Sequence, residues 1–290
     1  MIKGECLVNI KIIADSTCDL PEELILRHNI RIVPLSITKG DELLKDGIDI
    51  KPKEIFEYME SGKGTCKTSA VNVMEYTDVY NEEKSKCDAI IHFFISAEMS
   101  ACYQNARLAA EAFDNIYLID ARNLSCGIGN LVLDAAIMAQ SGKTAEEINA
   151  EIKRLIPLLD TGFIIDTLTY LHKGGRCSAV QALASSVLKI KPSIVVTDGK
   201  MVVGKKYRGN LEIVLRKYIE DRLSDKENID PRRILIANTM PQENQELVDM
   251  AKSIIMENIN FKEAHIVAAG STISCHCGPN TLGLMFFRKT

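Results

Sequence analysis

Residues 9–28, NIKIIADSTCDLPEELILRH, place a strand pattern, a polar loop and a helix pattern in direct succession, and this order decides the fold class. The first six residues contain three isoleucines and an alanine, which predicts a buried strand, and the next four form a short polar loop. Asp19 lies three residues before Glu22, which is the spacing of a capping box, and Pro21 falls in the first turn. The segment therefore predicts one β–loop–α unit whose loop follows the carboxyl end of the strand.

Strand and helix patterns keep alternating along the first half of the chain. Strands are predicted at residues 31–38, 88–96 and 116–120. Helices are predicted at residues 52–60, 73–80, 103–113, 129–140 and 144–159, with residues 61–69 as a polar loop. Such alternation predicts βαβ units and a mainly parallel sheet, in which ligands bind at the loops beyond the carboxyl ends of the strands.

The second half of the chain has a different pattern. Asp198-Gly199 is a strong hairpin signal between two β-rich runs. Further helices are predicted at residues 211–222 and 242–258, and further strands at residues 234–238 and 265–268. We therefore predict an α/β fold with two domains, residues 1–160 and 161–290, in which residues 161–190 connect the two or are shared by them.

The composition limits the classes of function. The 290 residues are 46% hydrophobic and 26% charged, a balance typical of a globular protein with a sizeable core. A net charge of −4 argues against a nucleic-acid partner. No apolar run approaches the roughly 18 residues of a membrane span, and the first residues lack the apolar core of a signal peptide. The nine cysteines are odd in number and irregularly spaced, and a chain of this length does not need a disulfide scaffold. We therefore expect free thiols in a reducing cytosol and a soluble cytoplasmic protein.

Residues 61–69, SGKGTCKTS, resemble a phosphate-binding loop without matching its pattern. That pattern requires a glycine directly before the Lys-Ser/Thr pair, and Cys66 stands there instead. A nucleotide site is therefore disfavoured, and a surface loop is the simplest alternative. Thr68 and Ser69 precede a predicted helix, where hydroxyls and backbone N–H groups suit an anion.

Two serines, Ser96 and Ser100, follow the apolar strand predicted at residues 88–96. Neither lies in a Gly-x-Ser-x-Gly elbow, so an esterase nucleophile is disfavoured. Ser100 is placed to cap the next helix, and the same free N–H groups suit an anion.

Residues 172–176, HKGGR, combine two glycines with three potential cations. The glycines allow a sharp turn, after which Arg176 can present its planar guanidinium to a carboxylate or a phosphate. A solvated basic turn is an equally good interpretation.

Residues 270–279, GSTISCHCGP, follow a predicted strand and contain many small side chains. Cys275, His276 and Cys277 cannot easily converge on one tetrahedral ion because they are adjacent, so no metal site is predicted. We interpret His276 as a hydrogen-bond donor, with a buried histidine of no function as the alternative. No catalytic set and no dinucleotide fingerprint emerges, so neither a catalytic residue nor a cofactor is predicted.

Seven stretches in the same order make the chain similar to the DegV family of fatty-acid-binding proteins along nearly its whole length. They are residues 12–21 (IIADSTCDLP), 33–37 (VPLSI), 67–72 (KTSAVN), 95–106 (ISAEMSACYQNA), 118–129 (LIDARNLSCGIG), 166–178 (DTLTYLHKGGRCS) and 274–283 (SCHCGPNTLG). Each stretch is unspecific by itself, and their common order makes the resemblance strong.

The resemblance implies an N-terminal Rossmann-like parallel sheet with helices on both faces, a C-terminal α/β domain, and a long-chain fatty acid held between and within them. It implies that Thr68 and Ser100 bind the carboxylate, with Ser96 as a second candidate and His276 beside the head group. Arg176 matches an arginine that contacts a partner, an ATP-dependent fatty acid kinase resembling dihydroxyacetone kinase, which converts the presented fatty acid to an acyl phosphate. The chain itself is then a carrier and not an enzyme.

Two motifs depart from the family pattern. Ser-Gly-Thr-Tyr reads Ser100-Ala-Cys-Tyr103 here, and Thr-Ser-Gln-Pro-Ser reads Thr68-Ser-Ala-Val-Asn72. Both hydroxyls expected at the anion remain, so carboxylate binding is predicted, while the shape of the pocket is expected to differ.

Three classes of function stay open at this point. A fatty-acid carrier is the first hypothesis, and lipid in an extract of the denatured protein would support it. The alternative is a phosphotransferase or kinase-like enzyme that uses the same loops for phosphate, which ATP turnover by the isolated chain would favour. The third is a regulatory or structural domain with a vestigial pocket.

Overall fold

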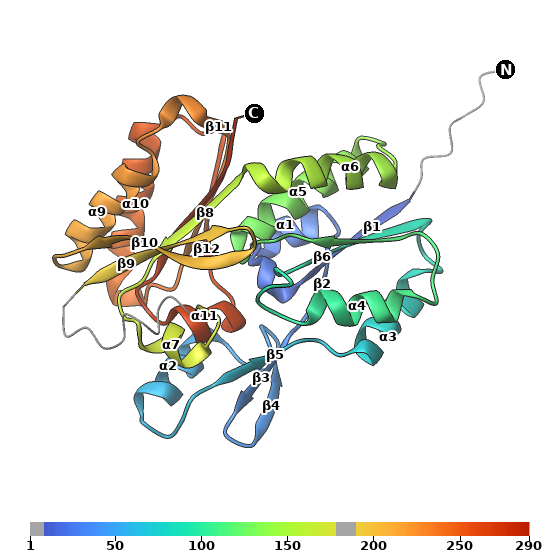
Figure 1. Cartoon of the computed structure of the whole chain (residues 1–290), viewed down its shortest axis with the longest axis horizontal. Coiled ribbons are helices and arrows are strands. Elements are labelled where there is room, and N and C mark those ends of the chain that lie inside the picture. Colours follow the sequence, from blue (N-terminus) through green and yellow to red (C-terminus); the bar gives the residue numbers. More distant parts are fainter. Residues whose placement is uncertain (1–8, 178–189, 290) are drawn as a thin grey trace.

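The computed structural model describes residues 9–177 and 190–289 (Figure 1). The strands are β1 (Ile10–Asp15), β2 (Arg31–Val33), β3 (Ser36–Lys39), β4 (Glu42–Lys45), β5 (Lys67–Ser69), β6 (Ala89–Phe94), β7 (Ile116–Asp120), β8 (Leu159–Ile164), β9 (Lys191–Thr197), β10 (Lys200–Tyr207), β11 (Ile229–Asn238), β12 (Glu263–Ala268) and β13 (Leu282–Arg288). The α-helices are α1 (Glu22–Arg27), α2 (Pro52–Glu60), α3 (Val73–Glu83), α4 (Cys102–Ala110), α5 (Cys126–Gln140), α6 (Ala145–Leu155), α7 (Thr169–Gly174), α9 (Leu211–Arg222), α10 (Gln245–Asn258) and α11 (Ser271–Cys277). Of the segment predicted to connect two domains, residues 178–189 lie outside the described residues.

The N-terminal half contains a parallel sheet with the strand order β2-β1-β6-β7. Helices α5 and α6 lie on one face and α3 and α4 on the other (Figure 1). Every residue of β6 is buried, as expected for a central strand covered on both faces. The predicted α/β class, with a parallel sheet between helices, is confirmed.

The C-terminal half contains a mixed sheet with the strand order β10-β9-β8-β13-β11-β12. Only its β11–β12 pair is parallel. Helix α9 packs against β8, β10 and β13, and α10 packs against α9. The hairpin predicted at Asp198-Gly199 is confirmed, since both residues have positive φ, 50° and 78°, as a type I′ turn requires.

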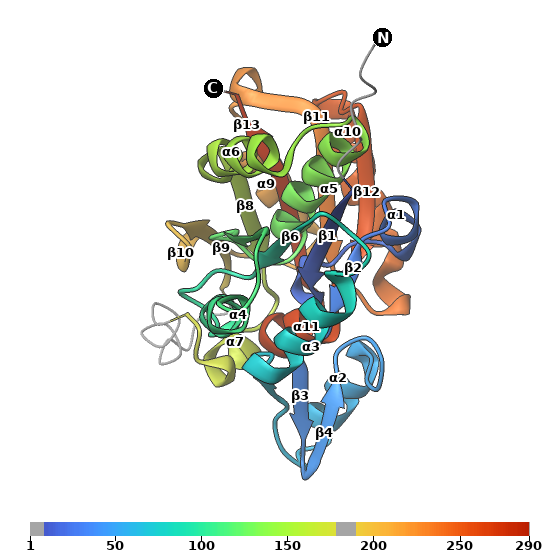
Figure 2. The same cartoon turned by 90° about the vertical axis from the view of Figure 1, so that its right-hand side faces the viewer.

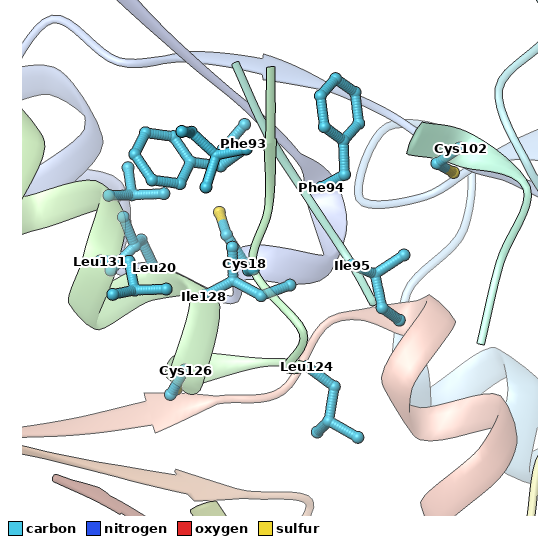
Figure 3. Packing of buried hydrophobic residues seen from close by; sticks show 14 of the residues in the cluster. Cys18, Leu20, Phe93, Phe94, Ile95, Cys102, Leu124, Cys126, Ile128 and Leu131 are labelled. Atoms are coloured by element: carbon cyan, nitrogen blue, oxygen red, sulfur yellow. The ribbon is translucent and has the colours of Figure 1, made fainter. Parts of the chain in front are cut away.

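Helix α5 lies between the two large sheets and contacts strands of both, β1 and β6 in one and β8, β11 and β13 in the other. Its residues 126–136 are buried without exception, because a helix covered on opposite sides cannot keep a polar face. In Figure 3, Phe93 of β6, Leu131 of α5 and Leu20 from the loop before α1 gather in one part of this core. Helix α5 therefore joins the two halves through continuous apolar packing.

A third, smaller sheet has the order β4-β3-β5 and is antiparallel. With α2 it extends from one end of the molecule, next to α11 (Figure 2). The prediction of one strand at residues 31–38 is therefore wrong, since β2 and β3 belong to different sheets. Pro34 separates them, because proline cannot donate a ladder hydrogen bond. Residues 67–69 form β5, so the predicted loop at residues 61–69 is too long.

Two strands of the mixed sheet, β8 and β13, were not predicted. Asp160 and Gly162 interrupt the apolar pattern of β8. Only the folded chain brings partners to the Asp160 carboxylate, namely Arg288 at 2.6 Å and Arg222. The helix predicted to reach residue 159 ends at Leu155. Its predicted capping box is confirmed, because Thr144 and Glu147 exchange the two reciprocal hydrogen bonds.

The capping box predicted from Asp19 and Glu22 is wrong. Pro21 occupies the N-cap position of α1 and the helix has no side-chain cap. Asp19 has a left-handed backbone, with φ of 44°, and its buried carboxylate binds groups far along the chain. A tertiary role of Asp19 has displaced the local one.

A buried ion pair also joins the two halves. Asp134 of α5 accepts a hydrogen bond from Arg233 of β11 at 3.0 Å, and their side chains are 8% and 5% exposed. Arg232 reaches the other carboxylate oxygen at 2.9 Å. Removing one partner of such a pair leaves a charge buried without compensation.

We expect Asp134→Ala to lower the free energy of unfolding by about 3 kcal/mol, because Arg233 then loses its buried carboxylate partner and keeps the half-exposed Glu263 and the Asn130 carbonyl. Urea denaturation measures the change. Glu151→Ala is the matched control, since its pair with Arg154 is exposed and should contribute about 0–1 kcal/mol. Equal losses in the two variants would contradict the importance of the buried pair.

Candidate functional site

A cavity of about 50 Å³ lies where the carboxyl ends of the parallel strands meet α11, α7 and the mixed sheet. A space of this size holds a few water molecules, so a larger ligand requires the lining side chains to move apart. Its apolar lining consists of Leu35, Ala70, Ile95, Met99, Leu124, Phe163, Leu171, Met201, Ile273 and Cys277. Its polar lining consists of Thr68, Ser69, Ser100, Arg176, Thr272 and His276. The polar set contains four of the five residues predicted to bind the ligand.

A hydrogen bond at this cavity joins two distant parts of the chain. Thr68 Oγ1 lies 2.9 Å from His276 Nε2, although the two residues are 208 positions apart. Thr68 is on β5 and His276 on α11, and the two elements pack against each other. The structure thus brings together two residues that the sequence motifs singled out separately.

His276 is held as a neutral imidazole. Burial, and secondly the positive charge of Arg176, lowers the pKa of His276 to about 4. The backbone of α7 packs directly against the ring, because a Cβ at Gly174 would lie 2.1 Å from Nδ1. Nδ1 is buried and has no hydrogen-bond partner among the described residues. Such a ring donates one hydrogen bond without bringing a charge into the cavity.

Ser100 lines the cavity two residues before α4 begins, and Ser69 lines it at the end of β5. The predicted capping role of Ser100 is wrong, because Ala101 occupies the N-cap position of α4 and the helix has no side-chain cap. The Ser100 Oγ instead accepts a hydrogen bond from the N–H of Cys102 at 3.3 Å. Ser69 is exposed and lies at the outer part of the lining.

Ser96 lies outside this lining. It is fully buried, and its hydroxyl donates to the carbonyl of Gly199 at 2.7 Å and accepts from the N–H of Glu98 at 3.3 Å. Gly199 is required there, since a Cβ would come within 2.6 Å of the Ser96 hydroxyl. Ser96 therefore anchors the β9–β10 turn to the N-terminal half.

Arg176 combines two properties that the sequence left as alternatives. Its side chain is exposed, and it also lines the cavity beside His276. Nη1 donates to the carbonyl of Gly174 at 2.8 Å. A cation thus stands at the mouth of the cavity, where both a bound anion and a docked protein can reach it.

Thr272 was missed by the sequence reasoning. It lies one turn before His276 on α11, lines the cavity, and has a buried hydroxyl without a hydrogen-bond partner among the described residues. Its spacing of four residues from His276 was the available signal, because such residues share a helix face. An unpaired buried hydroxyl in a cavity is available to bond a molecule that enters the cavity.

Two buried carboxylates hold the first residues of α11. Asp19 accepts from the N–H of Gly270 at 2.8 Å and from the Ser125 hydroxyl at 2.6 Å. Asp46 accepts from the N–H of Ser271 at 2.9 Å. Burial raises the pKa of Asp19 to about 7, although both hydrogen bonds oppose that shift. These contacts set where His276 lies.

A second cavity, of about 10 Å³, adjoins the first and reaches the mixed sheet at Met285. The two cavities share Leu124, Phe163, Ile273 and Cys277 as a common wall. These four side chains would have to move apart to join the cavities into one apolar slot.

The part of the chain that the structure describes holds no cluster of three or more histidine, cysteine, aspartate or glutamate side chains suited to a metal ion. None of the helices in residues 9–177 and 190–289 has the length and apolar character to cross a bilayer. The lysine of residues 61–69 that a P-loop would use, Lys67, begins β5 rather than a helix.

Comparison with known proteins adds independent evidence. Residues 9–289 match the model of a family described as "Uncharacterised protein, DegV family". The chain belongs to the DegV family. A DegV domain-containing protein of Caldanaerobacter subterraneus subsp. tengcongensis is 32% identical over 284 residues, which cover 97% of this chain and 99% of that protein.

Solved DegV structures share the whole architecture. One, described as showing fatty acid binding of a DegV family protein from Thermus thermophilus, has a TM-score of 0.89 and 28% identity, covering 97% of this chain and 99% of the other. A stearic-acid-binding protein from Eubacterium ventriosum has a TM-score of 0.84 and 26% identity, covering 97% and 98%. The two-domain DegV-like fold expected from the sequence is confirmed.

The neutral state of His276 predicts a pH dependence of stability. The unfolded chain binds a proton near the ordinary histidine pKa of about 6.5, whereas the folded chain binds it only near 4. Stability from this residue is therefore complete above about pH 6.5 and falls as the pH drops toward 4, by up to about 3 kcal/mol. Urea denaturation of lipid-free protein between pH 7.5 and 4 should show a smaller loss for His276→Gln than for the wild type. Identical slopes would contradict the burial of a neutral His276.

Proposed function

We propose that the protein binds one long-chain fatty acid, with its carboxylate at the polar side of the cavity and its acyl chain along the apolar lining. The observation that carries this proposal is the cavity itself. It combines a cluster of hydroxyls, one neutral imidazole and one arginine with a lining that is otherwise apolar. Solved DegV relatives above 25% identity are described as fatty-acid binding.

The head-group site is proposed to consist of Thr68, Ser100, Thr272 and His276, with Ser69 at its edge. Hydroxyls and an imidazole N–H are the neutral donors that a carboxylate accepts, and hydrogen bonds to a charged group are stronger than those between neutral groups. The charge balance comes from Arg176 at the mouth, which lines the same cavity. The Thr272 hydroxyl, which has no partner among the described residues, then gains one.

The acyl chain is proposed to extend from this site toward Phe163 and the second cavity. Burying a 16-carbon chain at about 0.8 kcal/mol per methylene contributes about 12 kcal/mol before the costs of ordering and association. Even half to two-thirds of that corresponds to roughly micromolar affinity or a little weaker. A fatty acid acquired in a cell would therefore be retained through purification.

We further propose that the protein is a cytoplasmic carrier that presents the carboxylate to an ATP-dependent kinase resembling dihydroxyacetone kinase, for conversion to an acyl phosphate. Arg176 is exposed and adjacent to the head-group site, so a docked partner can contact it while approaching the carboxylate. The kinase partner follows from the family resemblance of residues 166–178. The exposed cation at the cavity mouth is consistent with it.

Lipid analysis tests the proposal directly. Protein expressed in a bacterial host, purified and denatured should release a long-chain fatty acid in near-equimolar amount, measured by mass spectrometry of the extract. ATP hydrolysis by the isolated chain should stay at background. An extract without fatty acid, together with no uptake when fatty acid is supplied, would refute the proposal.

We expect Thr68→Val, Ser100→Ala and Thr272→Val each to weaken fatty acid binding about tenfold or more, since a hydrogen bond to a charged group contributes about 1.5–3 kcal/mol. Thr77→Val is the matched control, because the Thr77 hydroxyl bonds to the Val73 carbonyl within α3. Affinities from displacement of a fluorescent fatty acid, with melting temperatures alongside, separate loss of binding from loss of fold. Unchanged affinity in all three cavity variants would remove the head-group assignment.

A further inference from the structure

A separate and larger cleft lies at the edge of the parallel sheet, where β7 ends. Its volume is about 600 Å³, within the range of about 300–1,000 Å³ that small-molecule pockets occupy. Its walls are the turn after β7, the end of α6 with the following turn Ile156–Leu158, and the β9–β10 turn. Among the described residues, none lines both this cleft and the cavity of the proposed head-group site. The cleft is therefore a second place for a ligand, at the carboxyl end of a parallel strand, where open α/β sheets bind their ligands.

Two long-range hydrogen bonds hold the β9–β10 turn against the N-terminal half and keep the cleft open. The Ser96 hydroxyl donates to the Gly199 carbonyl at 2.7 Å, and the two residues are 103 positions apart. The Arg122 guanidinium donates to the Asp198 carbonyl, 76 positions away. Because both bonds end on the backbone of the turn, the turn cannot move into the cleft without breaking them.

Arg122 has a backbone conformation that is uncommon for a residue with a side chain. Its φ of 46° lies in the left-handed region. The Asp120 carboxylate holds this turn, because its Oδ1 accepts from the N–H of Arg122 at 2.9 Å and from the N–H of Ala97 at 3.2 Å. Such conformations persist where the surroundings determine them, and they cluster at binding sites. The turn brings a carboxylate and a guanidinium into the lining of the cleft together.

The lining contains two cations that are not paired with a carboxylate in the part of the chain that the structure describes. Lys153 of α6 is exposed and forms neither an ion pair nor a hydrogen bond there. Arg122 donates to a backbone carbonyl, which is a neutral acceptor. The hydroxyls of Tyr103 and Thr197 belong to the same lining and have no hydrogen-bond partner within the described residues. Two cations and two hydroxyl donors are the groups that bind a phosphate.

Two carboxylates in the lining narrow the class of ligand. Asp120 uses Oδ1 for two backbone N–H groups, whereas its Oδ2 accepts no hydrogen bond from the described residues. A carboxylate oxygen at a strand end suits a hydroxyl, as in the ribose contact of dinucleotide-binding folds. Asp198 is exposed on the β9–β10 turn, so solvent screens its charge. An acyl chain is a poor occupant, since it would remove both carboxylates from water without replacing their hydrogen bonds.

The remaining wall of the cleft is apolar. Leu118 of β7, Ile156 after α6 and Val196 of β9 are half-buried against the core and line the cleft, and the ring of Tyr103 adds an aromatic surface. Such a wall suits the face of a planar base, which is itself poor in hydrogen-bonding groups. Phosphate donors, a hydroxyl acceptor and an apolar wall thus occur in one cleft.

We propose that this cleft binds a ribonucleoside monophosphate. The phosphate binds Arg122 and Lys153, a ribose hydroxyl donates to Asp120, and the base lies against Leu118 and Val196. The ligand is bound without a chemical step, and its site is separate from that of the fatty acid.

Isothermal titration calorimetry of the full chain tests the proposal, with adenosine, guanosine, cytidine and uridine monophosphate as probes. We expect saturable binding of one equivalent of at least one of them. Lys153→Glu should weaken this binding about tenfold or more, because an attractive charge is replaced by a repulsive one. Lys252→Glu is the matched control, since Lys252 is an exposed lysine of α10 outside the cleft, and it should bind like the wild type.

A second variant tests the ribose contact. Asp120→Asn keeps an oxygen for the two backbone N–H groups and replaces the other oxygen by an NH₂ donor. It should weaken binding of the ribonucleotide about tenfold or more and leave binding of its 2′,3′-dideoxy analogue unchanged. Melting temperatures of all variants, measured alongside, show whether the fold is intact.

Four results would overturn the inference. They are no saturable binding of any of the four nucleotides, equal affinity in Lys153→Glu and the wild type, binding of inorganic phosphate or of the nucleoside as tight as that of the nucleotide, and equal affinity of the wild type for the ribose and dideoxy forms. Displacement of the nucleotide by fatty acid would also overturn it, because the cleft would then be a lipid site. The fatty acid content of the same samples tests the proposed function independently.

Discussion

Two carboxylates from the N-terminal half, Asp19 and Asp46, hold the first N–H groups of α11, and the geometry of the cavity depends on this contact. Helix α11 spans only seven residues, which is too short to be stable by itself. Its position is therefore set by what binds its ends and covers its sides. Because His276 lies one to two turns from the anchored end, the same contact places its ring opposite Thr68. The site is a consequence of joining the two halves.

Burial and hydrogen bonding have opposite effects on the pKa of Asp19 in this contact. The Ser125 hydroxyl and the Gly270 N–H favour the ionised carboxylate of Asp19, yet burial raises its pKa to about 7, so near neutral pH this carboxyl is close to the point of accepting a proton. Apolar packing around α5 offsets the cost of burying this carboxylate, because helix residues 126–136 are buried between the two large sheets. The interface therefore combines a large apolar contact with a few polar groups that fix its register.

Features whose causes are local were predictable from the sequence. The Asp198-Gly199 turn and the Thr144 cap depend on neighbouring residues, and both are found as expected. Features whose causes are tertiary were not. Asp19 has capping-box spacing, but its carboxylate accepts from the N–H of Gly270 instead. Strand β8 contains Asp160, whose arginine partners lie more than sixty residues away along the chain. At the site, the motifs indicated Thr68, Ser100 and His276 one by one. Only the folded chain shows that the Ser96 hydroxyl donates to the Gly199 carbonyl and that Thr272 lines the cavity.

The departures from the family motifs differ in consequence once their positions are known. Cys102 replaces the family threonine, but it is fully buried, lies outside the cavity lining, and has its sulfur 3.2 Å from the Ser100 hydroxyl. It contacts Ser100 from outside the cavity lining and leaves the cavity wall unchanged. Ala70 stands where the family pattern has glutamine, and it does line the cavity. A methyl group there leaves space that a longer amide side chain would fill. Any difference in acyl-chain preference between this protein and its relatives is therefore expected to originate at Ala70 rather than at Cys102.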